Sequence, residues 1–342
     1  MRWNIGRKKL IILTIAIALA AVLIVGYIHV SEKPEEEPTK VGLASWPKGL
    51  EIIPQYVAQD RGYFEDEGLE VEITYFRASA DAISAIVAGD LEFGLTSDVP
   101  LLKAIEAGVP IKAIGLIYYA SKKEGHIGTA YTALNESGIK NVEDLRGKRI
   151  AIPYVGGDTH INIVALLKEH GINPDEDVTF VVVPWPFMIE ALIKGEVDVV
   201  GLLPQHLTVM ELEGINYTIV TSSVDLLPRI ESLIIYASTD YIEENPDVVR
   251  RFLRAFYRGQ AYVETRPEAY KRYLADYGGW DPQVLEKLSI KKLLGMPHGG
   301  RFNETVWQEF IKLMVDNGYL KEEISVDRVL TEEYLPALKD LE

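Results

Sequence analysis

Apolar and polar residues follow two alternating patterns from Val41 onward. Short apolar or β-branched runs are separated by stretches whose apolar positions recur at helical spacing, which predicts an α/β fold with helices on the faces of a sheet. After residue 238 the pattern is almost wholly helical. The predicted strands are 41–45, 69–76, 91–95, 111–119, 149–152, 178–183, 197–202 and 232–237.

The first forty residues have a different pattern. Residues 10–30 are an uncharged apolar run, of the ~20 residues needed to span a bilayer as a helix, and basic residues precede it. Residues 1–30 are therefore predicted to be an uncleaved membrane anchor with the remainder of the chain outside the cytoplasm. A cleaved signal segment is the alternative, although its apolar core is usually shorter. Residues 31–40 are acidic and contain proline, which predicts an extended linker.

Charge and cysteine content exclude several classes of function. The 342 residues include 51 acidic and 35 basic side chains, a net charge of -16, which disfavours nucleic-acid binding. The absence of cysteine excludes a lipid-thioether anchor, disulfides and thiolate chemistry. The length favours two lobes rather than one.

Ligands of open α/β sheets bind beyond the carboxyl ends of the strands. This rule selects polar and aromatic residues that follow the predicted strands. The predicted ligand-binding residues are Trp46, Ser79, Thr96, Ser97, Tyr118, Gly157, Asp158, Thr159, His160, Trp185 and Glu231.

The stretch "GGDTHINIVALL" predicts a helix that begins near Asp158. A helix start presents unpaired N–H groups and a partial positive charge, so it suits an anionic head group. Gly157 would let a ligand approach the backbone, while Thr159 would add a hydroxyl donor and His160 an imidazole. The alternative is a tight turn and a helix cap. No metal is expected, because no second His or carboxylate stands at ligand spacing beside His160.

The remaining candidates have structural alternatives as well. Trp46 and Trp185, one from each lobe, could clamp an apolar stem or serve the core. The hydroxyl residues Ser79, Thr96 and Ser97 could donate to an oxyanion or cap helices. Glu231, like Asp98, could pair with an amine on an amphoteric ligand.

Four segments in order carry a family resemblance: "QYVAQDRGYFEDEGLEVEI" (55–73), "AGDLEFGLTSD" (88–98), "VEDLRGKRIAIPY" (142–154) and 156–172. The chain resembles the nitrate/sulfonate/taurine group of ABC-transporter substrate-binding proteins, to which thiamine-pyrimidine synthases are similar. The resemblance implies a type II periplasmic-binding fold with two hinge crossovers. Lobe one would comprise 41–119 and 232–342, and lobe two 120–231.

The resemblance implies a binding protein that captures a small anionic solute between its lobes, without a cofactor. Its partners would be an ABC permease and an ATPase on separate chains, and its soluble part would be monomeric. A thiamine-pyrimidine or riboflavin-like heterocycle is an alternative solute, since "LLPQ" (202–205) lacks the aromatic and acid of the sulfonate and taurine branch. A sensor module that reports the ligand without transporting it is a further alternative. A same-fold enzyme is disfavoured, because the synthases carry a cysteine-rich motif.

Overall fold

The computed structural model describes residues 37–50, 52–289 and 295–341. From Thr39 onward these residues belong to one compact unit. None of the helices in these ranges is long and apolar enough to cross a membrane. The predicted membrane segment 10–30 lies outside the described residues.

The first sheet has five strands in the order β2-β1-β3-β10-β4. β1 pairs in parallel with β2 and β3, whereas β10 is antiparallel to both β3 and β4. Because β1 begins at Thr39, the last two residues of the predicted linker 31–40 belong to a strand. The strands are β1 (Thr39–Ser45), β2 (Leu69–Tyr75), β3 (Phe93–Ser97), β4 (Ile111–Ser121) and β10 (Arg229–Ser238).

The second sheet also has five strands, in the order β7-β6-β8-β5-β9. All eight strands predicted from the sequence are present in the two sheets, with ends shifted by a few residues, but β5 and β9 were not predicted. β5 lies between single 3-10 turns rather than α-helices, so it interrupts the alternation on which the prediction relied, whereas β9 lies between α8 and α9. The strands are β5 (Ala130–Leu134), β6 (Arg149–Ile152), β7 (Thr179–Val182), β8 (Val199–Leu202) and β9 (Tyr217–Ser222).

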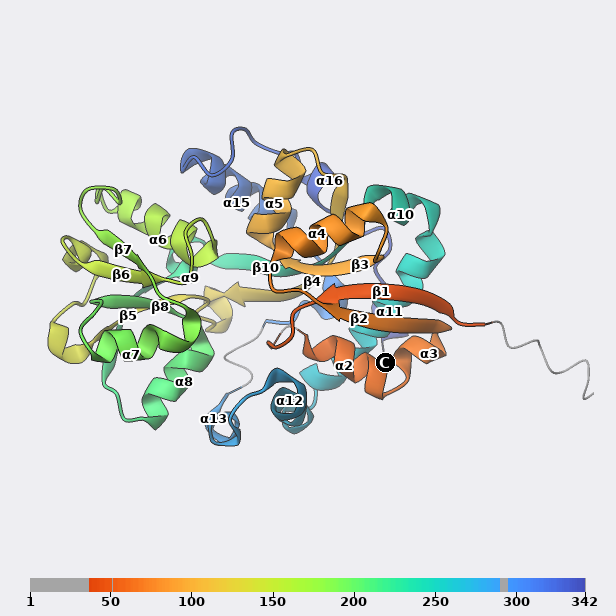
Figure 1. The fold of residues 1–342 in the computed structure, drawn as a ribbon, viewed down its shortest axis with the longest axis horizontal. Coiled ribbons are helices and arrows are strands. Elements are labelled where there is room, and N and C mark those ends of the chain that lie inside the picture. Colours follow the sequence, from red (N-terminus) through yellow and green to blue (C-terminus); the bar gives the residue numbers. More distant parts are fainter. Residues whose placement is uncertain (1–36, 51, 290–294, 342) are drawn as a thin grey trace, which may run out of the picture. The chain divides into compact units, whose positions relative to one another are not determined.

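Helices cover the sheets, and those after β10 pack with the first sheet (Figure 1). The helix predicted to begin near Asp158 is confirmed as α6. The described helices are α2 (Ile53–Asp60), α3 (Tyr63–Asp66), α4 (Ser79–Ala88), α5 (Asp98–Glu106), α6 (Asp158–Glu169), α7 (Met188–Ile193), α8 (Pro204–Leu212), α9 (Ser223–Leu226), α10 (Thr239–Glu244), α11 (Pro246–Glu264), α12 (Pro267–Tyr273), α13 (Pro282–Lys287), α15 (Glu304–Asp316) and α16 (Val326–Val329).

The long antiparallel pair β4 and β10 extends from the first sheet toward the second (Figure 1). Its register runs from Ser238 opposite Ile111 to Arg229 opposite Ser121. Tyr119 and Glu231, the residues at the predicted lobe boundaries, therefore lie within these two strands and face each other in the register. The exact lobe boundaries stay a prediction.

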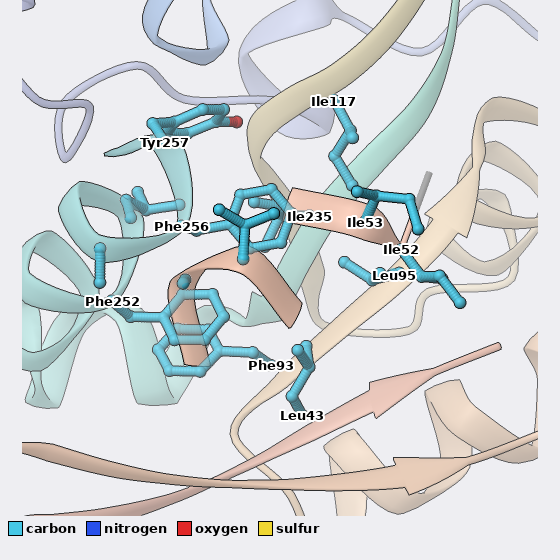
Figure 2. Packing of buried hydrophobic residues seen from close by; sticks show 14 of the residues in the cluster. Leu43, Ile52, Ile53, Phe93, Leu95, Ile117, Ile235, Phe252, Phe256 and Tyr257 are labelled. Atoms are coloured by element: carbon cyan, nitrogen blue, oxygen red, sulfur yellow. The ribbon is translucent and has the colours of Figure 1, made fainter. Parts of the chain in front are cut away.

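The main core lies where α2 and α11 pack against the first sheet (Figure 2). The rings of Phe93 and Phe252 stack with centroids 3.9 Å apart and an interplanar angle of 8°. Gly259 of α11 has no side chain because a Cβ there would press on the Pro54 carbonyl oxygen and lie 3.0 Å from the Ala58 nitrogen. These are backbone atoms of α2, so the helices could not relax locally.

We expect Gly259→Ala to destabilise the protein by about 1–3 kcal/mol, since overpacking against backbone must separate α11 from α2. Urea denaturation followed by circular dichroism measures the change. Arg250→Ala on the exposed side of the same helix, which loses a surface ion pair with Glu333, should cost under about 1 kcal/mol. Equal costs for the two substitutions would contradict the close packing of the two helices.

Candidate functional site

A cavity of about 220 Å³ lies between the ends of strands from both sheets. The cavity wall is largely apolar, with a few polar groups directed at one space, which is the composition typical of small-molecule sites. The lining residues are Leu50, Ser97, Asp98, Tyr118, Ala120, Gly128, Thr129, Tyr154, Asp158, Thr159, Asn162, Trp185, Leu203, Pro204, Gln205, Ser223, Ile230, Ser232 and Leu233.

A larger depression of about 1050 Å³ lies around α15 and α16. Charged side chains such as Lys112, Glu309 and Asp327 form much of its rim, and none of the predicted ligand-binding residues lines it. The smaller cavity is the better candidate because it combines enclosure with residues from both sheets.

A bulge in β10 shapes one wall of the cavity. Glu231 pairs with Tyr119 and Leu233 with Tyr118, so Ser232 is an extra residue between two consecutive partners. Bulges redirect side chains locally. Ser232, Leu233 and Tyr118 consequently line the cavity, while Glu231 is directed elsewhere.

The starts of α5 and α6 meet at the cavity. Asp98 is the first residue of α5 and Asp158 the first residue of α6. The Ser97 hydroxyl, at the end of β3, donates to Oδ2 of Asp158 at 3.4 Å, a long hydrogen bond that joins the two helix starts. Both helices therefore direct their N-terminal ends, but also a carboxylate each, toward the same space.

The two carboxyl groups affect each other. Asp98 is 1% exposed, and burial, followed by the charge of the Asp158 carboxylate and a hydrogen bond with it, raises the pKa of Asp98 well above its usual value of 3.8. Such a hydrogen bond requires a proton on one of the two carboxyl groups. The pair therefore favours binding a proton, or another positive charge, over full ionisation.

Three oxygen atoms of lining residues are buried without a hydrogen-bond partner in the described part of the chain. They are Oδ1 of Asp158, Oδ1 of Asn162 and Oε1 of Gln205. Buried polar atoms are normally hydrogen-bonded, so each one requires an explanation. A ligand or water that donates hydrogen bonds would satisfy all three.

Five of the predicted residues line this cavity: Ser97, Tyr118, Asp158, Thr159 and Trp185. The Thr159 carbonyl oxygen accepts a 2.6 Å hydrogen bond from the Tyr131 hydroxyl, which holds the first turn of α6 against β5. The indole of Trp185 stacks on the ring of His206, with centroids 5.3 Å apart, and thus forms a flat apolar wall.

The other predicted residues do not line the cavity. Trp46 packs against the core of the first sheet, Ser79 begins α4, and Thr96 is fully buried in β3. The position of Trp46 fits its structural alternative in the core. Neither hydroxyl residue caps a helix here, because the N-cap of α4 is Ala78 and Thr96 lies within a strand.

Gly157 and His160 stabilise the turn that precedes α6. A Cβ on Gly157 would collide with the ring of Tyr154, so the close approach at this glycine is made by a side chain of the protein itself. The His160 ring accepts a hydrogen bond from the Gly156 N–H at 3.1 Å, and its Nδ1 lies 3.2 Å from the Tyr319 hydroxyl oxygen. Burial lowers the pKa of His160, so the ring is neutral at pH 7.

Glu231 is 3% exposed and fully occupied by neighbouring groups. It accepts hydrogen bonds from the Asn303 N–H at 3.0 Å and the Trp307 indole at 3.1 Å, and it forms an ion pair with Arg229 at 2.8 Å. Burial raises the pKa of Glu231, although these donors and Arg229 oppose the effect. Its role in this structure is to attach the start of α15 to β10.

Sequence reasoning missed Asn162 and the β10 wall of the cavity. Asn162 was detectable, because it is a polar residue in an apolar helical run, one turn after Asp158. Ser232 was not, since its direction depends on the bulge. In the described ranges, no cluster of three His, Cys, Asp or Glu residues is placed to hold a metal ion.

We expect Asp98→Asn to stabilise the ligand-free protein at neutral pH. A raised pKa means that ionising this carboxyl costs native-state stability as pH rises above 3.8, by about 1.4 kcal/mol for each unit of elevation. The advantage of the variant should therefore grow from pH 4 to pH 8 in denaturation measurements. Asp240→Asn, at an exposed first-turn position of α10, should show no such growth. Parallel pH profiles for Asp98→Asn and the unmodified chain would contradict the predicted effect.

Comparison with known proteins supports the resemblance seen in the sequence. Residues 50–270 match the family described as NMT1/THI5 like. A 4-amino-5-hydroxymethyl-2-methylpyrimidine phosphate synthase of Candida albicans (strain WO-1) is 31% identical over 265 residues, 73% of this chain and 74% of that protein. The taurine-binding periplasmic protein of Escherichia coli (strain K12) is 28% identical over 253 residues, 72% of this chain and 71% of that protein.

Solved structures confirm the two-sheet α/β architecture of periplasmic binding proteins. The periplasmic aliphatic sulphonate binding protein SsuA from Escherichia coli superposes with a TM-score of 0.71 at 19% identity, covering 87% of this chain and 99% of that chain. The family match covers more than half of the sequence, and the fold agrees with it. The chain therefore belongs to the NMT1/THI5-like family.

Proposed function

We propose that the protein is the extracytoplasmic solute-binding component of an ABC importer. The observation that carries the proposal is the cavity enclosed between the two sheets, at the meeting point of the α5 and α6 starts. The names of relatives and structural neighbours, which include taurine-, sulphonate- and nitrate-binding periplasmic proteins, support the same reading. The proposed role is capture and delivery, without chemical change of the solute.

The proposed mechanism is closure of two lobes about the β4–β10 pair. Polar contacts join the parts built on the different sheets, among them Ser97 to Asp158, Asp98 to Asp158, and Tyr319 to His160. Contacts of this kind form when lobes close and are lost when they separate. A solute that touches both walls adds further contacts present only in the closed state, which shifts the population toward it.

Two classes of solute are candidates. A sulfonate-, taurine- or nitrate-type anion is supported by the names of relatives and by the helix starts, which offer N–H groups to an anion. A pyrimidine-like heterocycle is supported by the flat wall at Trp185 and by the name of the Candida relative. The cavity volume of about 220 Å³ suits a small solute of either class.

The synthase activity named for the Candida relative is the alternative function. The sequence resemblance implies a cysteine-rich motif in such synthases, and the present sequence has no cysteine at all. We therefore propose transport in preference to synthesis.

The proposed partners follow from the importer role. A permease and its ATPase would be separate chains, and the apolar segment 10–30 would hold the protein at the outer face of the cytoplasmic membrane. The solute-binding part would act as a monomer.

Calorimetry with taurine, ethanesulfonate, nitrate and 4-amino-5-hydroxymethyl-2-methylpyrimidine tests the proposal. We expect at least one of them to bind with a dissociation constant on the order of 1 μM or lower. Trp185→Ala should weaken that binding by about tenfold or more, because it removes an apolar wall of the cavity.

Trp46→Ala serves as the matched control, since Trp46 packs on the core and lies outside the cavity lining. Its affinity should stay within about twofold of that of the unmodified chain. Binding that depends on Trp46 but not on Trp185 would show that the solute site lies elsewhere.

A further inference from the structure

The polar contacts of the cavity are unbalanced in charge. Asp98 and Asp158 approach it from helices on different sheets. Oδ1 of Asp98 accepts a 2.8 Å hydrogen bond from the Val99 N–H, and Oδ2 of Asp158 accepts the long hydrogen bond from Ser97. Oδ1 of Asp158 is buried, and no donor of the described chain reaches it.

Among the described residues that line the cavity, no positive side chain compensates the two carboxylates. The described residues that line the cavity include no Lys, Arg or His. Arg229, on the neighbouring stretch of β10, is committed to Glu231 through its Nε and Nη2 atoms. Buried carboxylates without a cationic partner are costly, so the pair is a site for a positive charge from outside the chain.

Asn162 gives an independent indication of a ligand. It is 4% exposed, lies one turn after Asp158 on α6, lines the cavity, and its Oδ1 atom has no partner among the described residues. The Oε1 atom of Gln205, at the start of α8, is in the same situation. Amide groups can be turned to exchange oxygen for nitrogen, but a carboxylate cannot. The demand for hydrogen-bond donors therefore holds at Asp158 whichever way the two amides are turned.

The partial positive charges of the helix starts do not cancel the preference of this site for a positively charged group. Each helix start contributes a partial positive charge of about one half, whereas each ionised carboxylate carries a full negative charge. Water can donate hydrogen bonds to these oxygens in the free protein, but it brings no charge. A protonated amine brings both a charge and three donors, for which the unpartnered oxygens of Asp158 and Asn162 and the carboxylate of Asp98 are acceptors.

We propose that the solute presents a protonated amine, or a similar cationic N–H group, to Asp98 and Asp158, and that this group joins the two lobes. This inference rests on the proposed function, because it specifies one end of the solute bound at the same site. The remainder of the solute lies against Trp185, Tyr118 and Leu233. Anions that lack an N–H donor, such as nitrate or ethanesulfonate, are poor solutes, whereas an amphoteric molecule with an amine at one end is accepted.

Matched pairs of probes that differ in an amino and a hydroxyl group test the inference by calorimetry on the full-length chain at pH 7. The pairs are 2-aminoethanesulfonate with 2-hydroxyethanesulfonate, 2-phenylethylamine with 2-phenylethanol, and 4-amino-5-hydroxymethyl-2-methylpyrimidine with its 4-hydroxy analogue. We expect the amino member of at least one pair to bind at least about tenfold more tightly than its partner.

Two isosteric variants test whether the carboxylates of Asp98 and Asp158 distinguish the amino probes from the hydroxyl probes. Asp158→Asn should reduce the preference for the amino member to about threefold or less, mainly by weakening its binding, and Asp98→Asn should act in the same direction. The second variant keeps the test valid if the first does not fold. Asp240→Asn, remote from the cavity on α10, should retain the full preference.

The outcomes separate this inference from the proposed function. If the hydroxyl members bind as well as the amino members, if nitrate or ethanesulfonate binds more tightly than every amine, or if both variants keep the preference, the solute-binding role stands and the inference is overturned. If none of these probes binds to the unmodified chain at millimolar concentration, the proposed function falls together with it.

Discussion

The pairing of β4 with β10 is the constraint on which the rest of the structure depends. These strands belong to the first sheet, yet they extend toward the second and supply the wall of the cavity that faces both helix starts. Their hydrogen bonds fix where Tyr118 and Leu233 lie relative to α5 and α6. Because the two strands run antiparallel, a small twist of the pair would move one sheet relative to the other without breaking the ladder. The element about which the proposed closure would occur is thus also the element that positions the site.

Much of the fold was predictable because hydrophobic periodicity records burial on one face of an element. The eight predicted strands follow from this pattern, and the α6 start follows from the pattern together with the glycines and Asp158 ahead of it. β5 and β9 escaped prediction because each pairs antiparallel, and because single 3-10 turns rather than α-helices flank β5. Antiparallel neighbours do not need a helical crossover, so their presence does not show in an alternation of strands and helices.

The candidate site was predictable only in part, since strand ends indicate a region and not a direction. Ser97, Asp158 and Trp185 follow strands or begin helices at the cavity and were found by that rule. Glu231 was predicted as a carboxylate near the cleft and not by this rule, and the bulge beside it directs its carboxylate toward Trp307 instead. Gly157 was predicted to admit a ligand, and the space above it is filled by Tyr154. Both differences arise from side-chain packing that a periodic pattern does not encode.

The two carboxylates at the cavity lower the stability of the ligand-free protein, and we interpret this cost as a consequence of their role in ligand binding. A helix start normally gains from an acidic residue in its first turn, and each of α5 and α6 has one. Each aspartate therefore stabilises its own helix, while the approach of the two helices brings Asp98 and Asp158 together in a buried space where their charges repel. Local and long-range electrostatics conflict at this point, and such conflicts are expected at functional sites rather than in structural cores. The cationic solute group that we propose would remove the conflict, so the free energy released on relieving the repulsion would contribute to the proposed closure of the lobes.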